Sequence, residues 1–194
     1  MNRNMVDPAA AFRRALFRAF ALSALAALLL LLATSHARAV EVVPSVGLTR
    51  SVDADEANSQ VGLALRGDIA PRVLQAEIGA SYRREDAAPD VVQRMWPVTA
   101  SLWLTPLSAL YAGAGVGWYH TTFDYKGPLA LEDETFQDFG VHLGGGMKVP
   151  LASSVAVDLN GRYVMMQDQE DSRLVPSDFN PDFWTLAAGL AFKF

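Results

Sequence analysis

Ionisable residues of both signs recur inside segments that otherwise alternate apolar and small residues. Arg66 and Glu77 flank one short turn, and Lys148 and Asp158 flank another. Charges held inside a fold are tolerated only when they are paired and hydrogen-bonded, so we predict a plug of mutually compensating charges. The other chemistry open to such a set is a gated or narrow path for ions. The whole set is Arg66, Glu77, Asp138, His142, Lys148, Asp158, Arg162 and Lys193, with Glu41 beside it.

A second group of ionisable residues is acidic and gathers between those segments. We expect a solvated surface, although carboxylates also suit Ca²⁺ and Mg²⁺, so bridging by divalent cations is an alternative. SVDADEANS (51–59) has the alternating acids of a calcium loop but lacks its glycine and closing glutamate. We therefore predict no dedicated metal, cofactor or catalytic site. The other acidic stretches are REDAAPDVV (84–92), DYKGPLALEDE (124–134) and QDQEDSRLVPSDFNPD (167–182).

The elements that carry these residues have a period of two. From residue 40 onward, stretches of about ten residues alternate bulky apolar with small or polar side chains, which is the pattern of β-strands. Tight connections alternate strictly with longer acidic ones, as in the up-and-down meander of a transmembrane barrel. The eight expected strands are 41–51, 58–68, 73–84, 93–104, 109–122, 135–148, 154–166 and 183–194.

The two faces of these strands predict which one contacts lipid. In 135–148, Val141 and Leu143 alternate with His142 and Gly144. Side chains only just fill the bore of eight strands, so we place the small and charged set in the lumen and the bulky apolar set against lipid. Closure of the sheet leaves no unpaired backbone edge in hydrocarbon. The expected fold class is all-β: a transmembrane, eight-stranded, antiparallel up-and-down β-barrel, preceded by a cleaved signal peptide.

Aromatic residues gather near the ends of the expected strands. Phe192 and Phe194 fall near the short-turn end, and six others fall near the long-loop end. Two such belts flanking an apolar band are typical of a protein that meets two membrane interfaces. The belt predicted at the long-loop end consists of Tyr82, Trp96, Trp118, Phe139, Tyr163 and Trp184.

The N-terminus predicts export. Basic residues precede the apolar run AFALSALAALLLLLA (19–33), and Ala37 and Ala39 form a small-residue cleavage pattern. This arrangement is typical of a secretory signal peptide, and the run is short for a spanning helix. We predict a signal peptide over 1–39, cleaved after Ala39, and one barrel domain over 40–194.

The charge balance of the expected mature chain argues against nucleic acid. Residues 40–194 hold 11 Lys and Arg and 20 Asp and Glu, which gives 11 − 20 = −9. Nucleic-acid binding needs basic patches. The chain has no cysteine, so an exported form must be stable without disulfides.

The last strand resembles the C-terminal assembly motif of bacterial outer-membrane barrels. FWTLAAGLAFKF (183–194) carries apolar or aromatic residues at alternate positions and ends on Phe194. LYAGAGVGWYHTTFDY (110–125) and FGVHLGGGMKVPL (139–151) resemble strands of small OmpA-like or OmpW-like barrels. The resemblance covers 40–194 and is one of architecture. The residues that match the assembly motif are Trp184, Leu190, Phe192 and Phe194.

The resemblance implies residence in the bacterial outer membrane, among lipid and lipopolysaccharide. It also implies recognition of the last strand by the barrel-assembly machinery. It does not extend to the peptidoglycan-binding domain that follows some barrels of this kind. The implied role is non-enzymatic: structural, surface-interacting, or a narrow passage for small solutes.

Two other function classes remain as alternatives. Some small outer-membrane barrels modify lipid A, but the deacylase His-x-Ser pair would here be His120-Thr121-Thr122, which lacks the serine. The amphipathic helix of the palmitoyltransferase kind is not expected either, because Val40 leads almost directly into the first strand. The second alternative is a soluble periplasmic barrel that binds an apolar ligand.

Overall fold

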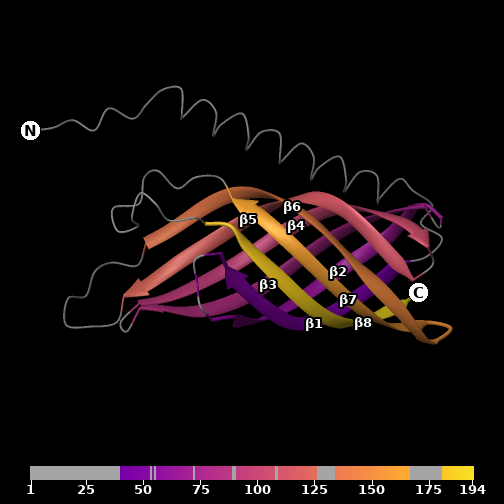
Figure 1. Ribbon diagram of the computed structural model, residues 1–194, viewed down its shortest axis with the longest axis horizontal. Coiled ribbons are helices and arrows are strands. Elements are labelled where there is room, and N and C mark those ends of the chain that lie inside the picture. Colours follow the sequence, from indigo (N-terminus) through magenta and orange to yellow (C-terminus); the bar gives the residue numbers. More distant parts are fainter. Residues whose placement is uncertain are drawn as a thin grey trace, which may run out of the picture.

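The computed structural model describes residues 40–52, 54, 56–71, 73–88, 91–107, 109–125, 134–166 and 181–194. These residues form eight antiparallel strands in one closed barrel, in which each strand pairs with its neighbours in sequence and β1 pairs with β8 (Figure 1). The expected all-β, eight-stranded up-and-down barrel is confirmed. The strands are β1 (Val40–Ser51), β2 (Asn58–Ala70), β3 (Leu74–Ala88), β4 (Val91–Leu107), β5 (Leu110–Tyr125), β6 (Glu134–Ala152), β7 (Val155–Met166) and β8 (Phe183–Lys193).

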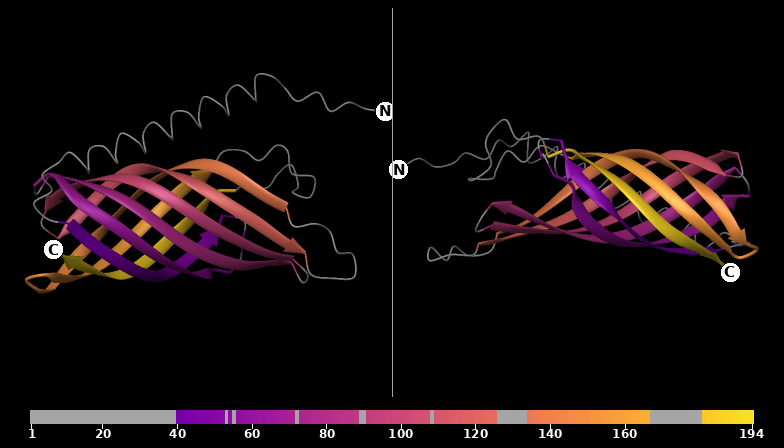
Figure 2. Two further views of the ribbon diagram at one scale, coloured as in Figure 1. Left: turned by 180° about the vertical axis from the view of Figure 1, so that it is seen from behind. Right: turned by 60° about the horizontal axis from the view of Figure 1, so that its bottom comes forward.

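The start of β1 and the end of β8 meet at the end of the barrel that carries the tight turns. The backbone N–H of Phe194 donates to the carbonyl of Val40 at 2.9 Å, and the N–H of Val40 donates back at 3.3 Å. Figure 2 shows the C-terminus beside the β6–β7 turn. We call this the short-turn end and the opposite end the loop end. No helix among the described residues is long and apolar enough to cross a membrane.

One expected connection is wrong. The stretch 84–92 was predicted as an acidic loop, but β3 and β4 continue through it and pair as far as Ala88 and Val91, which leaves only 89–90 between them. Glu85 pairs with Gln93 within this extension. An antiparallel ladder continues wherever both chains stay extended, and the β-branched pair Val91-Val92 favours that conformation.

The outer face of the barrel is apolar and the lumen is lined by small and polar residues. The contrast is sharpest between sequence neighbours: Leu143 is 57% exposed and His142 is 1% exposed. Val46, Leu63 and Leu186 are likewise more than half exposed on their strands. A water-soluble fold buries such side chains, so this facing matches the inverted arrangement predicted from the sequence.

Candidate functional site: the charged lumen

Arg66 lies at the centre of the lumen and holds two carboxylates. Its Nε is 2.5 Å from Glu77 Oε2 on the adjacent strand, and its Nη1 is 2.5 Å from Asp158 Oδ2 on β7. The three side chains are 0 to 3% exposed. Arg66 and Glu77 are register partners across the β2–β3 turn, as the sequence predicts. Asp158 reaches Arg66 from the far side of the bore.

Arg162 completes a neutral set of four charges. Its Nη2 donates to Glu77 Oε1 at 2.7 Å, and its Nε donates to Asn160 Oδ1 at 2.7 Å. Glu77 thus serves two guanidinium groups, one from β2 and one from β7. We call Arg66, Glu77, Asp158 and Arg162 the tetrad. Its two positive and two negative charges compensate one another, which is the condition for burying charge away from water.

Aromatic rings fill the space around the tetrad. Tyr111 donates from its hydroxyl to Asp158 Oδ1 at 2.8 Å, and it accepts from Asn160 Nδ2 at 3.1 Å. Its ring lies 5.3 Å from that of Trp103, which is 0% exposed. The guanidinium of Arg162 lies 5.1 Å from the Trp103 ring. The middle of the bore is therefore packed by side chains from β2, β3, β4, β5 and β7.

Lys148 belongs to a separate pair nearer the short-turn end. The sequence places it beside Asp158, and the two are register partners on β6 and β7. Their side chains nevertheless have different partners. Lys148 forms an ion pair with Glu41 and also donates to Gln75 Oε1 at 3.1 Å. Asp158 is taken by Arg66, whose planar guanidinium meets both carboxylate oxygens at once. The predicted placement of Lys148 and Asp158 on adjacent strands around one turn agrees with the register, and each side chain pairs with a different strand across the lumen.

Three other residues of the predicted charge network are not members of the tetrad. Lys193 is exposed and makes no ion pair with any residue in the described part of the chain, so the structure does not place it in the network. Asp138 lies on the lumen face of β6 opposite Tyr119. His142 is buried and hydrogen-bonds through Nε2 to Ser101 Oγ at 2.9 Å.

The Ser101–His142 pair is the nearest approach to a catalytic arrangement among the described residues. A nucleophile and a base at this separation suit proton transfer. Both residues are only 1% exposed, and His142 Nδ1 has no hydrogen-bond partner to orient the ring. The sequence analysis missed Ser101. Its inward position opposite both Glu77 and Gly115 could have been found by carrying the register from strand to strand.

The alternate glycines of β5 make room for the lumen rings. A Cβ on Gly117 would lie 2.6 Å from Cε2 and 2.7 Å from Oη of Tyr119. A Cβ on Gly115 would meet the His142 ring at 2.5 Å. A real Cβ atom does not come this close to a non-bonded atom. Positions 115 and 117 must therefore stay without a side chain while the two rings keep their places.

Gly117→Ala is therefore expected to lower the free energy of unfolding by about 1–3 kcal/mol, the usual range for overpacking. Tyr119 cannot yield easily because it packs against Met95, Val164 and Phe183. The measurement is urea unfolding of the refolded barrel. Gly161→Ala is the matched control, since its Cβ would meet only the movable end of Leu186 at 3.1 Å. Equal loss in both variants would contradict the steric account.

Most residues of the predicted aromatic belt lie on the outer face. Trp96, Trp118 and Tyr163 are 55%, 38% and 41% exposed. Phe139 shares this face but is only 6% exposed, and it stacks on its register partner Trp118 with ring centroids 6.5 Å apart. The half-buried members are Tyr82 and Trp184.

The residues that match the assembly motif share the outer face of the last strand. Leu190 is 42% exposed and Phe194 is 80% exposed. Trp184 and Phe192 have the same parity and are half-buried. On the opposite parity of β8, Phe183 and Ala191 are buried in the lumen.

The acidic stretches place no metal site in the described part of the chain. No group of three or more His, Cys, Asp or Glu side chains gathers there. Most acids of 124–134 and 167–182, together with Asp53, Asp55 and Asp90, lie outside the described residues. Divalent-cation bridging at the loop end stays a prediction.

A family model described as the outer membrane protein beta-barrel domain matches residues 20–194. A search of curated proteins finds no match. Three solved structures share the fold: Neisserial surface protein A, the Yersinia pestis attachment invasion locus protein Ail with a heparin analogue, and the Pseudomonas aeruginosa outer membrane protein OprG.

The structural agreement covers nearly all of each of these proteins at low sequence identity. Neisserial surface protein A has a TM-score of 0.61 at 15% identity, over 80% of this chain and 96% of its own. Ail has a TM-score of 0.56 at 12% identity, over 80% and 97%. OprG has a TM-score of 0.53 at 13% identity, over 80% and 95%. The likeness at this identity concerns the fold, and the family match covers most of the chain. This chain belongs to the outer membrane protein β-barrel domain family.

Proposed function

We propose that this protein is a non-enzymatic component of the bacterial outer membrane, structural or surface-interacting, with a closed lumen. The tetrad carries the proposal. It links β2 and β3 to β7 across the bore through ion pairs of 2.5 to 2.7 Å. Breaking it would leave buried charges without partners, so opening along this route is unfavourable.

The packing beside the tetrad favours a closed lumen rather than a passage for small solutes. Trp103 is 0% exposed and Tyr111 is 4% exposed, and both stand at the level of the tetrad. A path for ions or solutes would have to displace these rings as well as the ion pairs. An eight-stranded barrel has little spare width in which to move them.

Single-channel recording in a planar bilayer tests this proposal. The refolded protein should run as a compact, heat-modifiable band on a gel and give no steady conductance, because the tetrad and Trp103 fill the bore. The gel is the control that the protein is folded. Steady conductance from folded protein would contradict closure and make Arg66, Asp158 and Arg162 the lining of a passage.

The buried Ser101–His142 pair weighs against a lipid-modifying enzyme. Lipid substrates contact the outer face, whereas this pair is 1% exposed and lies in the lumen. Trp103 is the aromatic neighbour of His142, with ring centroids 6.4 Å apart. Equal lipid A masses in cells with and without the gene would agree with a non-enzymatic role, and a defined mass shift would overturn it.

The remaining parts of the proposal concern export and surroundings. We propose that residues 1–39 are removed on export, so that the mature protein begins at Val40, which the intact mass of the purified protein tests. The outward residues of β8, with Phe194 80% exposed, are proposed to be read by the barrel-assembly machinery. The apolar outer face is proposed to contact lipid and lipopolysaccharide, and acidic residues at the loop end to bridge to it through divalent cations.

A further inference from the structure

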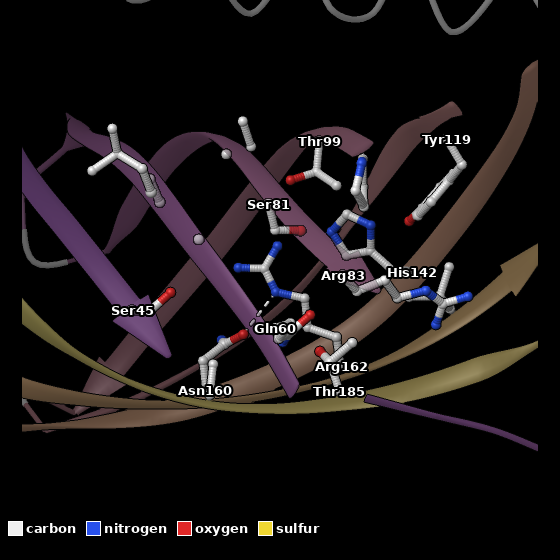
Figure 3. Close-up of a pocket in the computed structure, with 18 of the residues that line it drawn as sticks. Ser45, Gln60, Ser81, Arg83, Thr99, Tyr119, His142, Asn160, Arg162 and Thr185 are labelled. Carbon is white, nitrogen blue, oxygen red and sulfur yellow. Dashed lines mark hydrogen bonds between the residues drawn. The ribbon is translucent and has the colours of Figure 1, made fainter. Parts of the chain in front are cut away.

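A cavity of about 90 Å³, lined by both polar and apolar residues, lies in the lumen next to the tetrad. Its volume is several times that needed for one water molecule. Arg83, Tyr119, His142 and Arg162 line it from four different strands. Figure 3 shows Ser81, Thr99, His142 and Arg162 around this space, with Arg83 beside His142 and its guanidinium directed away from Ser81 and Thr99. Nothing in the tetrad or in the proposed structural role uses this cavity.

Arg83 differs from the two lumen arginines of the tetrad. Arg66 holds two carboxylates and Arg162 holds one. Arg83 is 5% exposed, yet among the described residues it forms no ion pair. Glu85, two positions along the same face of β3, is not within ion-pair distance of it. Arg83 is therefore a buried cation without a carboxylate partner in the described chain.

The contacts that Arg83 does make are neutral. Nη1 donates to Thr49 Oγ1 at 2.9 Å, and the guanidinium lies 4.3 Å from the centroid of the Phe183 ring. A cation–π contact and one neutral hydrogen bond offset only part of the free energy needed to bury a full charge. Nε has no hydrogen-bond partner. This atom belongs to the edge of the guanidinium that a planar oxyanion can bridge.

Two more unpartnered polar atoms belong to residues that line the cavity. The hydroxyl of Tyr119 is buried without a hydrogen-bond partner, and so is Nδ1 of His142. Both residues are 1% exposed. When Ser101 donates to Nε2 of neutral His142, the ring proton is on Nδ1, which then acts as a donor. Buried polar atoms are normally satisfied, so three unpartnered groups around one cavity point to a hydrogen-bond acceptor as ligand.

We propose that this cavity binds a small monovalent oxyanion, preferentially a carboxylate, on Arg83 with Tyr119 and His142 as further donors. The charges of the lumen residues indicate that the ligand carries a single negative charge. The tetrad is neutral by itself, and Arg83 adds one positive charge that forms no ion pair with a carboxylate of the described residues. A carboxylate matches the planar edge of the guanidinium, which a spherical halide does not. Because Arg162 both lines the cavity and belongs to the tetrad, the cavity ends at the plug and forms a binding site rather than part of a pore.

Calorimetric titration of the refolded, detergent-solubilised protein with sodium acetate tests the inference. Separate titrations with sodium phosphate and sodium chloride at equal ionic strength identify the ligand class. We expect acetate to bind with one site per chain and to raise the urea midpoint of unfolding, since a ligand of the folded state stabilises it. We expect Arg83→Gln to weaken acetate binding by about tenfold or more, the effect of losing a charge-assisted hydrogen bond.

Two further variants separate the site from general electrostatics. Tyr119→Phe keeps the ring but removes one donor, so it should weaken acetate binding while the barrel stays folded. Arg50→Gln removes a cation outside the cavity, whose Nε donates to the Ala54 carbonyl at 2.7 Å, and should leave binding unchanged. No binding of any of the three anions, binding of chloride alone, or equal affinity in Arg83→Gln, Tyr119→Phe and the unmodified protein would overturn the proposal. The closure of the bore is measured separately by conductance.

Discussion

Glu77→Ala is expected to destabilise the barrel by about 3–5 kcal/mol, the range for removing one partner of a buried ion pair. Glu77 is 0% exposed and accepts from both Arg66 and Arg162. Its loss leaves two guanidinium groups to share Asp158. The measurement is urea unfolding in lipid vesicles, followed by the heat-modifiable gel shift.

A double-mutant cycle shows whether the effect arises from the tetrad. Arg162→Ala alone removes the second donor to Glu77, and the combined variant removes the pair. Because the residues interact directly, the combined loss should be smaller than the sum of the single losses by about 0.5–3 kcal/mol. Additive losses would mean that Glu77 does not compensate Arg162.

Lys193→Ala provides the matched control for a residue that sequence analysis placed in the same network. The structure leaves Lys193 exposed near the short-turn end. A surface substitution of this kind should change stability by no more than about 0.5 kcal/mol. A loss as large as that of Glu77→Ala would place Lys193 in the network after all.

The facing of the strands was predictable because alternation is a local property. Once Leu143 is assigned to lipid, the preceding residue, His142, must face the lumen, and the same alternation holds along every strand. The Arg66–Glu77 contact was predictable for a similar reason, since a short turn fixes the register of the two strands that it joins. These inferences need only the sequence on either side of a turn.

The contacts across the bore were not predictable in this way. Asp158 pairs with Arg66 from another strand 92 positions away, and this depends on how the closed sheet is staggered. The sequence placed Lys148 and Asp158 around one turn but did not show which cation pairs with Asp158. The choice between the two cations is made in three dimensions, by reach and by the bidentate geometry of arginine.

The structure was also needed to recognise that Arg83 forms no ion pair with a described residue. In the sequence, Arg83 is one more inward charge beside an acidic stretch that offers many partners. The structure extends β3 and β4 through that stretch, and Glu85 then lies along the strand without forming an ion pair with Arg83. What distinguishes Arg83 is the lack of a described carboxylate around it, which no motif encodes.

Leu143→Arg is expected to destabilise the barrel in a bilayer by about 2–4 kcal/mol, the effect of a cation at the hydrocarbon midplane of an outer-membrane barrel. Leu143 lies in the middle of β6 and is 57% exposed on the outer face. In a detergent micelle, which admits water more readily, the loss should be smaller. Urea unfolding in vesicles and in micelles measures the difference.

Gly144→Arg is the matched substitution on the other face of the same strand. Its side chain would enter the lumen, where a Cβ already meets the Gly161 carbonyl oxygen at 2.5 Å and Arg162 Cγ at 3.1 Å. Overpacking and a further positive charge beside the tetrad do not depend on the surrounding solvent, so its loss should be similar in vesicles and micelles. The two neighbours thus separate lipid exposure from lumen packing. If Leu143→Arg were tolerated in vesicles while Gly144→Arg alone depended on the bilayer, the assignment of the apolar face to lipid would be wrong.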